Sequence, residues 1–146
     1  MSPLDHARDL FARGYAVIPL PPRSKRAVAE GWPEMRLGEG DLPEVFNQPS
    51  MNIGILLGEP SGWRIDIDLD HPLAVELAPQ YLPPTGAVFG RASKRQSHWL
   101  YRVKGAIETR KFKLPPAPGQ KSGEMVVELR STGCQTTTSP DWGRKL

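Results

Sequence analysis

The hydrophobic and polar positions of this chain alternate most regularly between Gly62 and Asp70, where the sequence reads Gly-Trp-Arg-Ile-Asp-Ile-Asp-Leu-Asp. A period of two predicts a strand. Because successive side chains of a strand point to opposite faces, Asp66, Asp68 and Asp70 share one face and the apolar residues largely take the other. The segment is therefore predicted to be a strand with one acidic and one apolar face.

Shorter patterns of the same kind recur along the chain. Ser2-Pro3 and Gly14 are typical of the start and the stop of a helix, and further short helices are expected over 41–48 and from His71. Apolar runs bounded by turn residues predict strands over 15–20, 52–57, 87–89, 97–103, 124–130 and 135–138. Strands with few helices between them predict an α+β fold with a mainly antiparallel sheet.

Two segments between the expected strands give further structural predictions. Five turn-type residues, 58–62, lie between two apolar runs and predict a hairpin that joins strand 52–57 to the acidic strand. The segment 105–123 lacks a clear period, and we expect a basic loop there. The length of 146 residues fits a single domain over 1–146.

Composition narrows the class of protein. The sequence has no apolar run of about 18 residues and no signal-peptide pattern, so neither a membrane span nor secretion is expected. Cys134 is the only cysteine, which excludes a disulfide within the chain and fits a cytoplasmic location.

Basic residues are unevenly distributed, although the formal net charge is only +3. A smaller group near the start contains Arg23, Lys25 and Arg26. A larger group lies in the second half and consists of Lys94, Arg95, Arg102, Lys104, Arg110, Lys111, Lys113 and Lys121. A basic surface beside an acidic site suits a polyanionic substrate; the alternative is a solvated face that keeps the protein soluble.

Carboxylates on one strand face repel one another unless a cation lies between them. Oxygen-rich sites suit Mg²⁺ or Mn²⁺, although an acidic edge strand facing solvent has the same pattern. Two other strands contain polar residues within apolar runs, His98 in 97–103 and Glu128 in 124–130. If these strands are neighbours of the acidic one, Asp66, Asp68 and Glu128 form a three-carboxylate cluster beside His98, which suits two-metal phosphoryl transfer. A structural histidine and an edge glutamate are the alternatives.

The order of these motifs resembles the bifunctional DNA primase/polymerase N-terminal (prim-pol) domain of the archaeo-eukaryotic primase superfamily. The matching pieces are Ile-Asp-Ile-Asp at 65–68, Ser-His at 97–98 and Val-Glu-Leu-Arg at 127–130. Weaker matches are 14–20, the 24–32 loop with Lys25, Asn-Ile-Gly-Ile at 52–55, and Arg-Ser-Thr-Gly at 130–133. The resemblance covers almost the whole chain.

The resemblance implies a template-directed DNA primase/polymerase encoded by a plasmid, phage or integrated element. It implies an RRM-like catalytic sheet with an N-terminal α/β part. Asp66, Asp68 and Glu128 would hold two Mg²⁺ or Mn²⁺ ions, and His98 would contact the nucleotide phosphates. The resemblance also implies that nucleotide is bound by Lys25, Ser97 and Arg130. Asp70 has no counterpart and is expected to be a helper or a surface charge. The implied partners are a single-stranded DNA template, nucleoside triphosphates and a replicative helicase.

The sequence after Gly133 departs from the family pattern, since the expected apolar strand and Pro-Pro-Ser segment are replaced by Cys134 to Asp141 and a short tail. A domain truncated at its C-terminus is therefore a second expectation: a catalytically incomplete remnant that binds nucleotide or single-stranded DNA. A metal nuclease, or another transferase with an Asp-x-Asp motif, is a third.

Overall fold

The computed structural model of the protein describes residues 1–138, so the departure from the family pattern beyond Thr138 lies outside the described residues. It contains two sheets, one of three strands in the order β1-β2-β8 and one of five strands in the order β4-β5-β3-β7-β6. All neighbouring strands in both sheets are antiparallel. The expected α+β fold with a mainly antiparallel sheet is confirmed.

The helices and strands have the following bounds. The helices are α1 (Pro3–Ala12), α2 (Leu42–Val45) and α3 (Pro72–Tyr81), with single 3₁₀ turns at Trp32–Glu34, Glu39–Asp41 and Glu59–Ser61. The strands are β1 (Val17–Leu20), β2 (Asn52–Leu56), β3 (Arg64–Leu69), β4 (Val88–Arg91), β5 (Lys94–Arg102), β6 (Arg110–Lys113), β7 (Met125–Arg130) and β8 (Gln135–Thr138).

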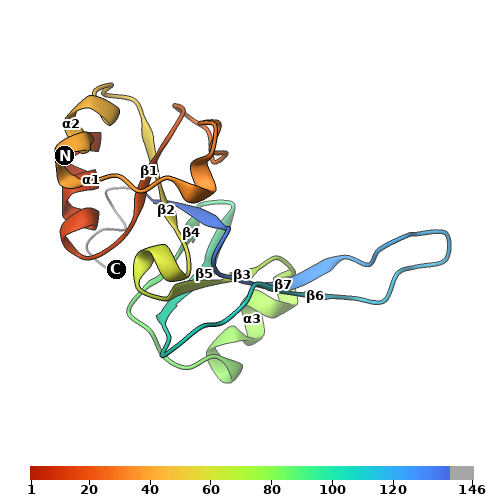
Figure 1. The fold of residues 1–146 in the computed structure, drawn as a ribbon. Coiled ribbons are helices and arrows are strands. Elements are labelled where there is room, and N and C mark those ends of the chain that lie inside the picture. The colour runs from red at the N-terminus through yellow and green to blue at the C-terminus, as the bar shows by residue number, and fades with distance from the viewer. Residues whose placement is uncertain (139–146) are drawn as a thin grey trace.

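The three-stranded sheet and helices α1 and α2 form one part of the molecule (Figure 1). Helix α1 begins as the sequence predicts, because Ser2 and Asp5 form a capping box. Its buried face contributes Ala7 and Leu10 to a core shared with β2. This part is a small α/β layer built from both ends of the described chain, since β8 pairs with β2.

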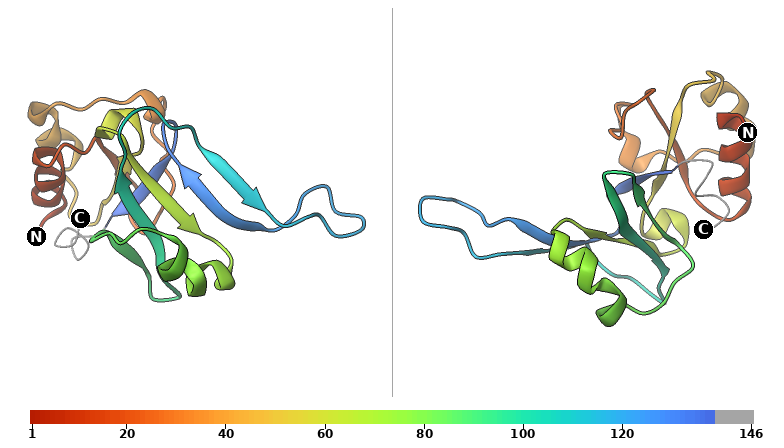
Figure 2. Two further views of the ribbon diagram at one scale, coloured as in Figure 1. Left: turned by 90° about the horizontal axis from the view of Figure 1, so that it is seen from below. Right: turned by 180° about the vertical axis from the view of Figure 1, so that it is seen from behind.

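The five-stranded sheet has two unlike faces. Ile65, Ile67 and Leu69 of β3 pack in a core with Ala78 of α3, so this helix covers the apolar face. On the other face, Leu100 of β5 packs in the core of the three-stranded part. Asp66 lies opposite Leu100, so the acidic face of β3 is turned toward the three-stranded part. Figures 1 and 2 show α3 on the other side of the five-stranded sheet.

The predicted hairpin between strand 52–57 and the acidic strand is wrong. Strand β2 lies between β1 and β8, and β3 lies between β5 and β7, so neither has a free edge for the other. Only an isolated bridge, Gly58 to Arg64, joins the two segments. The turn between them carries the chain from one sheet to the other.

Part of the expected basic loop at 105–123 is also a strand. Residues 110–113 form β6, the edge of the five-stranded sheet, and pair with β7. This pair continues into a long hairpin that projects away from the rest of the protein (Figures 1 and 2). Among the described residues, no helix is long and apolar enough to span a membrane.

Candidate active site

The register of three strands places the expected site residues side by side. Asp68 of β3 lies opposite His98 of β5 and opposite Glu128 of β7. Asp66, two residues earlier, lies opposite Arg130. Because directly opposed residues of antiparallel strands project to the same face, the five side chains gather on the face that α3 leaves uncovered.

Asp66 forms the buried floor of this group, with no exposed side-chain surface. Its Oδ2 atom accepts a hydrogen bond from Nδ1 of His98 at 2.9 Å and lies 3.6 Å from a guanidinium nitrogen of Arg130. Its Oδ1 atom is buried and has no hydrogen-bond partner among the described residues. A buried carboxylate oxygen without a donor is unusual, and a cation is one group that would satisfy it.

His98 is held in one orientation by two contacts. Its Nδ1–H donates to Asp66, and its ring stacks on Phe89 with the centroids 5.1 Å apart. Burial alone would lower the pKa of His98, but the hydrogen bond that its ring donates to Asp66 and the negative charges of Asp66 and Asp68 outweigh burial and raise the pKa. The raised pKa favours the cationic form of the imidazole more than in a free histidine, which suits contact with an anion.

A second group of carboxylates lies toward the end of β3. Oxygen atoms of Asp68, Asp70 and Glu128 all come within 4.8 Å of one another. Burial raises the pKa of Asp68, with the nearby charges of Asp66 and Asp70 acting in the same direction and His98 and Lys94 opposing it. Sequence reasoning left Asp70 as either a helper or a surface charge, although its place as the third acidic residue of the alternation was the available signal for a site role.

Cationic side chains surround these carboxylates. Nζ of Lys94 lies 3.0 Å from Asp70 and 4.0 Å from Asp68, and Nζ of Lys111 lies 3.9 Å from Glu128. Sequence reasoning named neither lysine as a site residue, because nothing in a single sequence shows that the β4–β5 turn and the edge strand approach the acidic face.

Lys25 approaches the site from the loop after β1. Its pKa is lowered, first by partial burial and then by the positive charges of Arg91 and Lys94, while Asp68 acts in the opposite direction. Three cations from two separate segments thus lie close enough to influence one another. Like charges gathered in this way favour an anion among them.

The backbone of the Lys25 loop is fixed by two amide side chains. Nε2 of Gln135 donates to the Lys25 carbonyl at 2.7 Å, and Nδ2 of Asn52 donates to the Ser24 carbonyl at 3.0 Å. The guanidinium of Arg130 donates in turn to the Gln135 carbonyl at 2.5 Å. The loop is therefore linked through β8 to the same arginine that faces Asp66.

Ser97 occupies a different environment from the other predicted residues. Its side chain is buried, and its hydroxyl donates to the Lys94 carbonyl at 3.0 Å. This bond braces the β4–β5 turn beneath Lys94. A direct role for Ser97 in nucleotide binding stays a prediction.

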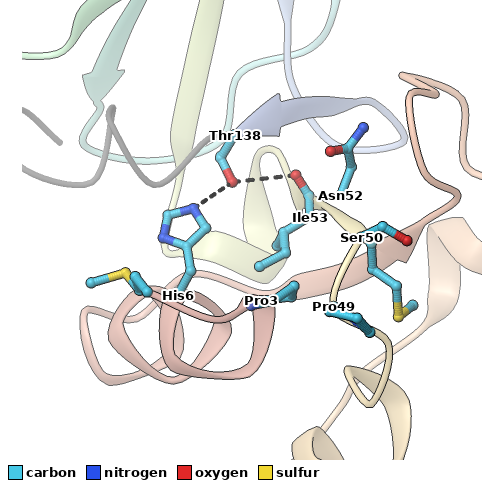
Figure 3. Close-up of a pocket in the computed structure, with 9 residues that line it drawn as sticks. Pro3, His6, Pro49, Ser50, Asn52, Ile53 and Thr138 are labelled. Atoms are coloured by element: carbon cyan, nitrogen blue, oxygen red, sulfur yellow. Dashed lines mark hydrogen bonds between the residues drawn. The ribbon is translucent and has the colours of Figure 1, made fainter.

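A separate pocket of about 240 Å³ lies between α1, β2 and β8, away from the carboxylates (Figure 3). At its wall, the Thr138 hydroxyl donates to the Ile53 carbonyl at 3.2 Å and lies 3.1 Å from Nε2 of His6. Because this hydroxyl donates its proton to the carbonyl, it accepts from His6, which fixes the Nε2–H tautomer. The pocket belongs to the packing of α1 and carries no carboxylate.

Comparison with known proteins supplies the family. A search of the curated proteins finds no match. The family model of the bifunctional DNA primase/polymerase N-terminal domain matches residues 7–144, which is nearly the whole chain and includes every site residue described above. The chain therefore belongs to the bifunctional DNA primase/polymerase N-terminal (Prim-Pol) family.

Proposed function

We propose that this chain is a metal-dependent nucleotidyltransferase that joins nucleotides to a primer strand on a single-stranded DNA template, within a plasmid, phage or integrated element. The observation that carries the proposal is the row of His98, Asp68 and Glu128 across three strands, with buried Asp66 beside it. Family membership gives the class of reaction, and this row provides the groups that such a reaction needs.

The residues on this face fit a divalent metal. Asp68, Asp70 and Glu128 offer oxygens within 4.8 Å of one another, and Asp66 offers a buried oxygen without a hydrogen-bond donor. Oxygen donors of this kind suit Mg²⁺ or Mn²⁺. We assign metal binding to Asp66, Asp68 and Glu128, with Asp70 as an added ligand. When bound, two such ions would neutralise phosphate charge and lower the pKa of the attacking hydroxyl.

The cations around the carboxylates suit the triphosphate of an incoming nucleotide. His98 presents Nε2, since Nδ1 is committed to Asp66. Arg130 lies on the same face, and Lys25 and Lys94 lie at its rim. Charge-assisted hydrogen bonds from such groups to phosphate oxygens are strong and orient the ligand. These residues would hold the phosphates while the carboxylates hold the metals.

The test is incorporation of labelled nucleotides on primed and unprimed single-stranded templates with Mg²⁺ or Mn²⁺. The wild-type chain should extend the primer, and the Asp66→Ala/Asp68→Ala variant should not. A Glu39→Ala/Glu44→Ala variant removes two exposed carboxylates outside both sheets and should retain the activity. Full synthesis by the Asp66→Ala/Asp68→Ala variant would exclude these residues from catalysis.

The same assay separates the alternatives. Binding of nucleotide or single-stranded DNA without incorporation would favour a catalytically incomplete remnant. Metal-dependent release of cleaved ends would favour a nuclease, in which the carboxylates activate water instead of a hydroxyl.

A further inference from the structure

We propose that the β6–β7 hairpin arm, residues 110–124, binds the backbone of the single-stranded nucleic acid that enters or leaves the carboxylate site. This inference rests on the proposed function, because it names a surface that would hold the template of that reaction. The arm projects away from the body of the protein in each view (Figures 1 and 2).

The arm is an ordered hairpin. Beyond β6, the Leu114 amide donates to the Glu124 carbonyl at 2.9 Å, so the two sides of the hairpin stay paired. At the tip, the Gln120 amide donates to the Ala117 carbonyl at 2.9 Å, and Pro118 and Gly119 occupy the corner with Gly119 at φ +83°. Proline followed by a glycine of positive φ is the sequence preference of a type II turn. The sequence therefore specifies an arm of defined shape.

The arm is predominantly basic. Residues 110–124 contain one acidic residue, Glu124, and four basic ones: Arg110, Lys111, Lys113 and Lys121. Within the described part of the chain, the side chains of Arg110 and Lys121 have no ion-pair or hydrogen-bond partner, and the Lys113 side chain bonds only to the Ser122 hydroxyl. Charges on an edge strand, lysine especially, and prolines discourage strand-to-strand aggregation. A predominantly basic arm in addition complements a polyanion.

Exposed apolar groups are interleaved with these cations. All four residues of β6 are exposed, and Phe112 and Leu114 show 53% and 45% of their surface. By register, Phe112 and Arg110 lie on the face that α3 covers, opposite Val127 and Leu129, whereas Lys111 lies on the carboxylate face. A single strand that follows the outer edge of β6 would stack a base on the ring while the basic side chains on both faces contact its phosphates. This combination favours a single strand over a duplex, whose bases are already stacked.

The base of the arm is continuous with the carboxylate site. Glu128 and Lys111 lie opposite each other on β7 and β6, 3.9 Å apart between charged atoms. Nine residues of extended chain from Glu128 to Gly119 span about 30 Å, the length of roughly nine stacked nucleotides. A strand bound along the arm would therefore lead directly into the metal-binding face.

The test measures the affinity of the whole chain for a labelled oligo-dT of about 20 nucleotides by fluorescence anisotropy, between about 50 and about 200 mM KCl. The Arg110→Ala/Lys113→Ala/Lys121→Ala variant should bind about tenfold more weakly at low salt. Its plot of log affinity against log salt should be shallower by about 2, since each lost phosphate contact on a single strand removes about 0.7.

Two variants serve as controls. Arg8→Ala/Arg36→Ala/Lys104→Ala removes three exposed cations that lie outside the arm and should leave the salt slope unchanged. Lys113→Arg/Lys121→Arg keeps the charges and should bind like the wild type. With an oligo-dT of about six nucleotides, too short to cover both the site and the arm, the alanine variant should show little defect.

A measurement without substitutions guards against misfolding of the variants. Bound oligo-dT should protect Lys113 and Lys121 of the wild-type chain from acetylation, read by mass spectrometry, and leave Lys104 reactive. Unchanged reactivity of both lysines, or a salt slope that the alanine variant shares with the wild type, would overturn the proposal. If the alanine variant bound duplex DNA more weakly but bound oligo-dT like the wild type, the proposal would also be overturned. If arm-dependent binding appears without nucleotide incorporation, the proposed function fails while the arm's role stands.

Discussion

At the scale of single residues, the site is organised by Asp66. Its carboxylate is fully buried, yet it faces His98 and Arg130 on one side and carries an unpartnered oxygen on the other. Burying a charge is unfavourable unless the surrounding groups compensate for it. The hydrogen bond from His98 and the nearby guanidinium of Arg130 supply part of that compensation, and in the proposed function a metal ion would supply the rest.

The pKa of His98 should depend on Asp66. In an Asp66→Asn variant the carboxylate charge is lost while burial of the ring remains, so the pKa of His98 should fall from its raised position. Titration of the histidine ring signals by NMR measures this directly. His6 lies far from the site, and burial is the main cause that lowers its pKa. Its NMR signal is therefore an internal control, and the pKa read from it should not change. An unchanged pKa of His98 would show that the Asp66 carboxylate does not raise it.

Lys94 should compete with metal for the outer carboxylates. Its ammonium lies 3.0 Å from Asp70 and 4.0 Å from Asp68, in a region that a bound divalent ion would share. A Lys94→Gln variant should bind Mn²⁺ about fivefold more tightly, which corresponds to ~1 kcal/mol of removed repulsion. Electron paramagnetic resonance of free Mn²⁺ provides the measurement. Arg95→Gln removes a neighbouring exposed charge and should have a smaller effect; equal effects would assign the change to net charge alone.

At the scale of elements, the link between the two sheets depends on Gly58. This residue has φ +78°, and a Cβ atom there would lie 2.3 Å from the amide nitrogen of Thr132. The chain passes at this point from β2 of one sheet to β3 of the other. Only glycine accommodates both the backbone conformation and the close approach of the segment after β7.

Substitution at Gly58 should therefore be far more damaging than at Gly105. Gly105 also has positive φ, +90°, but nothing lies within 4 Å of its Cβ position. We expect Gly105→Ala to lower the free energy of unfolding by about 1 kcal/mol, the strain of a left-handed conformation. Gly58→Ala should lower it by ~3 kcal/mol or more, since the clash adds to the strain. Urea unfolding of the two variants gives the difference, and similar losses would show that the Thr132 contact relaxes freely.

His6 should make the protein sensitive to mild acid. Burial lowers the pKa of His6 below its ordinary value of 6.5. The unfolded chain therefore takes up a proton at higher pH than the folded chain, so stability is complete above the unfolded pKa and declines as the pH falls through the folded one. A His6→Gln variant keeps a donor for Thr138 but does not titrate. Its unfolding free energy should fall less than that of the wild type between about pH 7 and about pH 5, and parallel curves would exclude His6 as the cause.

Local patterns predicted the elements better than they predicted which elements pair. The alternation around Asp66 specified β3 and its acidic face, because the two-residue period of a strand is a local property. The partners of β2 were mispredicted, since pairing with β8 joins residues far apart in the sequence and depends on the whole sheet. Strand β6 was missed because Arg-Lys-Phe-Lys contains a single apolar residue and its pairing depends on β7.

At the scale of the whole molecule, the site lies where the two sheets meet. The carboxylates come from the five-stranded sheet, while Lys25 comes from a loop held by β8 and β2 of the three-stranded sheet. Motif order identified the carboxylates, His98 and Arg130 as site candidates, because each lies in a strand with a readable pattern. The approach of Lys94 and Arg91 could not be foreseen, since it depends on how the β4–β5 turn is placed against the loop of Lys25.

This arrangement predicts that Gln135 sets nucleotide affinity without touching the nucleotide. Its side chain holds the Lys25 carbonyl, and its own carbonyl accepts from Arg130. In a Gln135→Ala variant the Lys25 loop loses one of its two tethers. The KM for nucleotide should then rise about five- to tenfold while kcat changes by less than about twofold, because in the proposed function the Lys25 loop would position the phosphates while the carboxylates remain in place.

Steady-state incorporation at saturating Mn²⁺ measures the two constants separately. Gln48→Ala, an exposed glutamine outside both sheets, should leave both constants unchanged. Thermal unfolding of Gln135→Ala, followed by circular dichroism, checks that the fold is retained, since β8 also closes the three-stranded sheet. A fall in kcat with KM unchanged would mean that Gln135 acts through Arg130 on the carboxylate face. A rise in KM alone would assign its effect to the loop, and would show that the three-stranded part contributes to nucleotide binding.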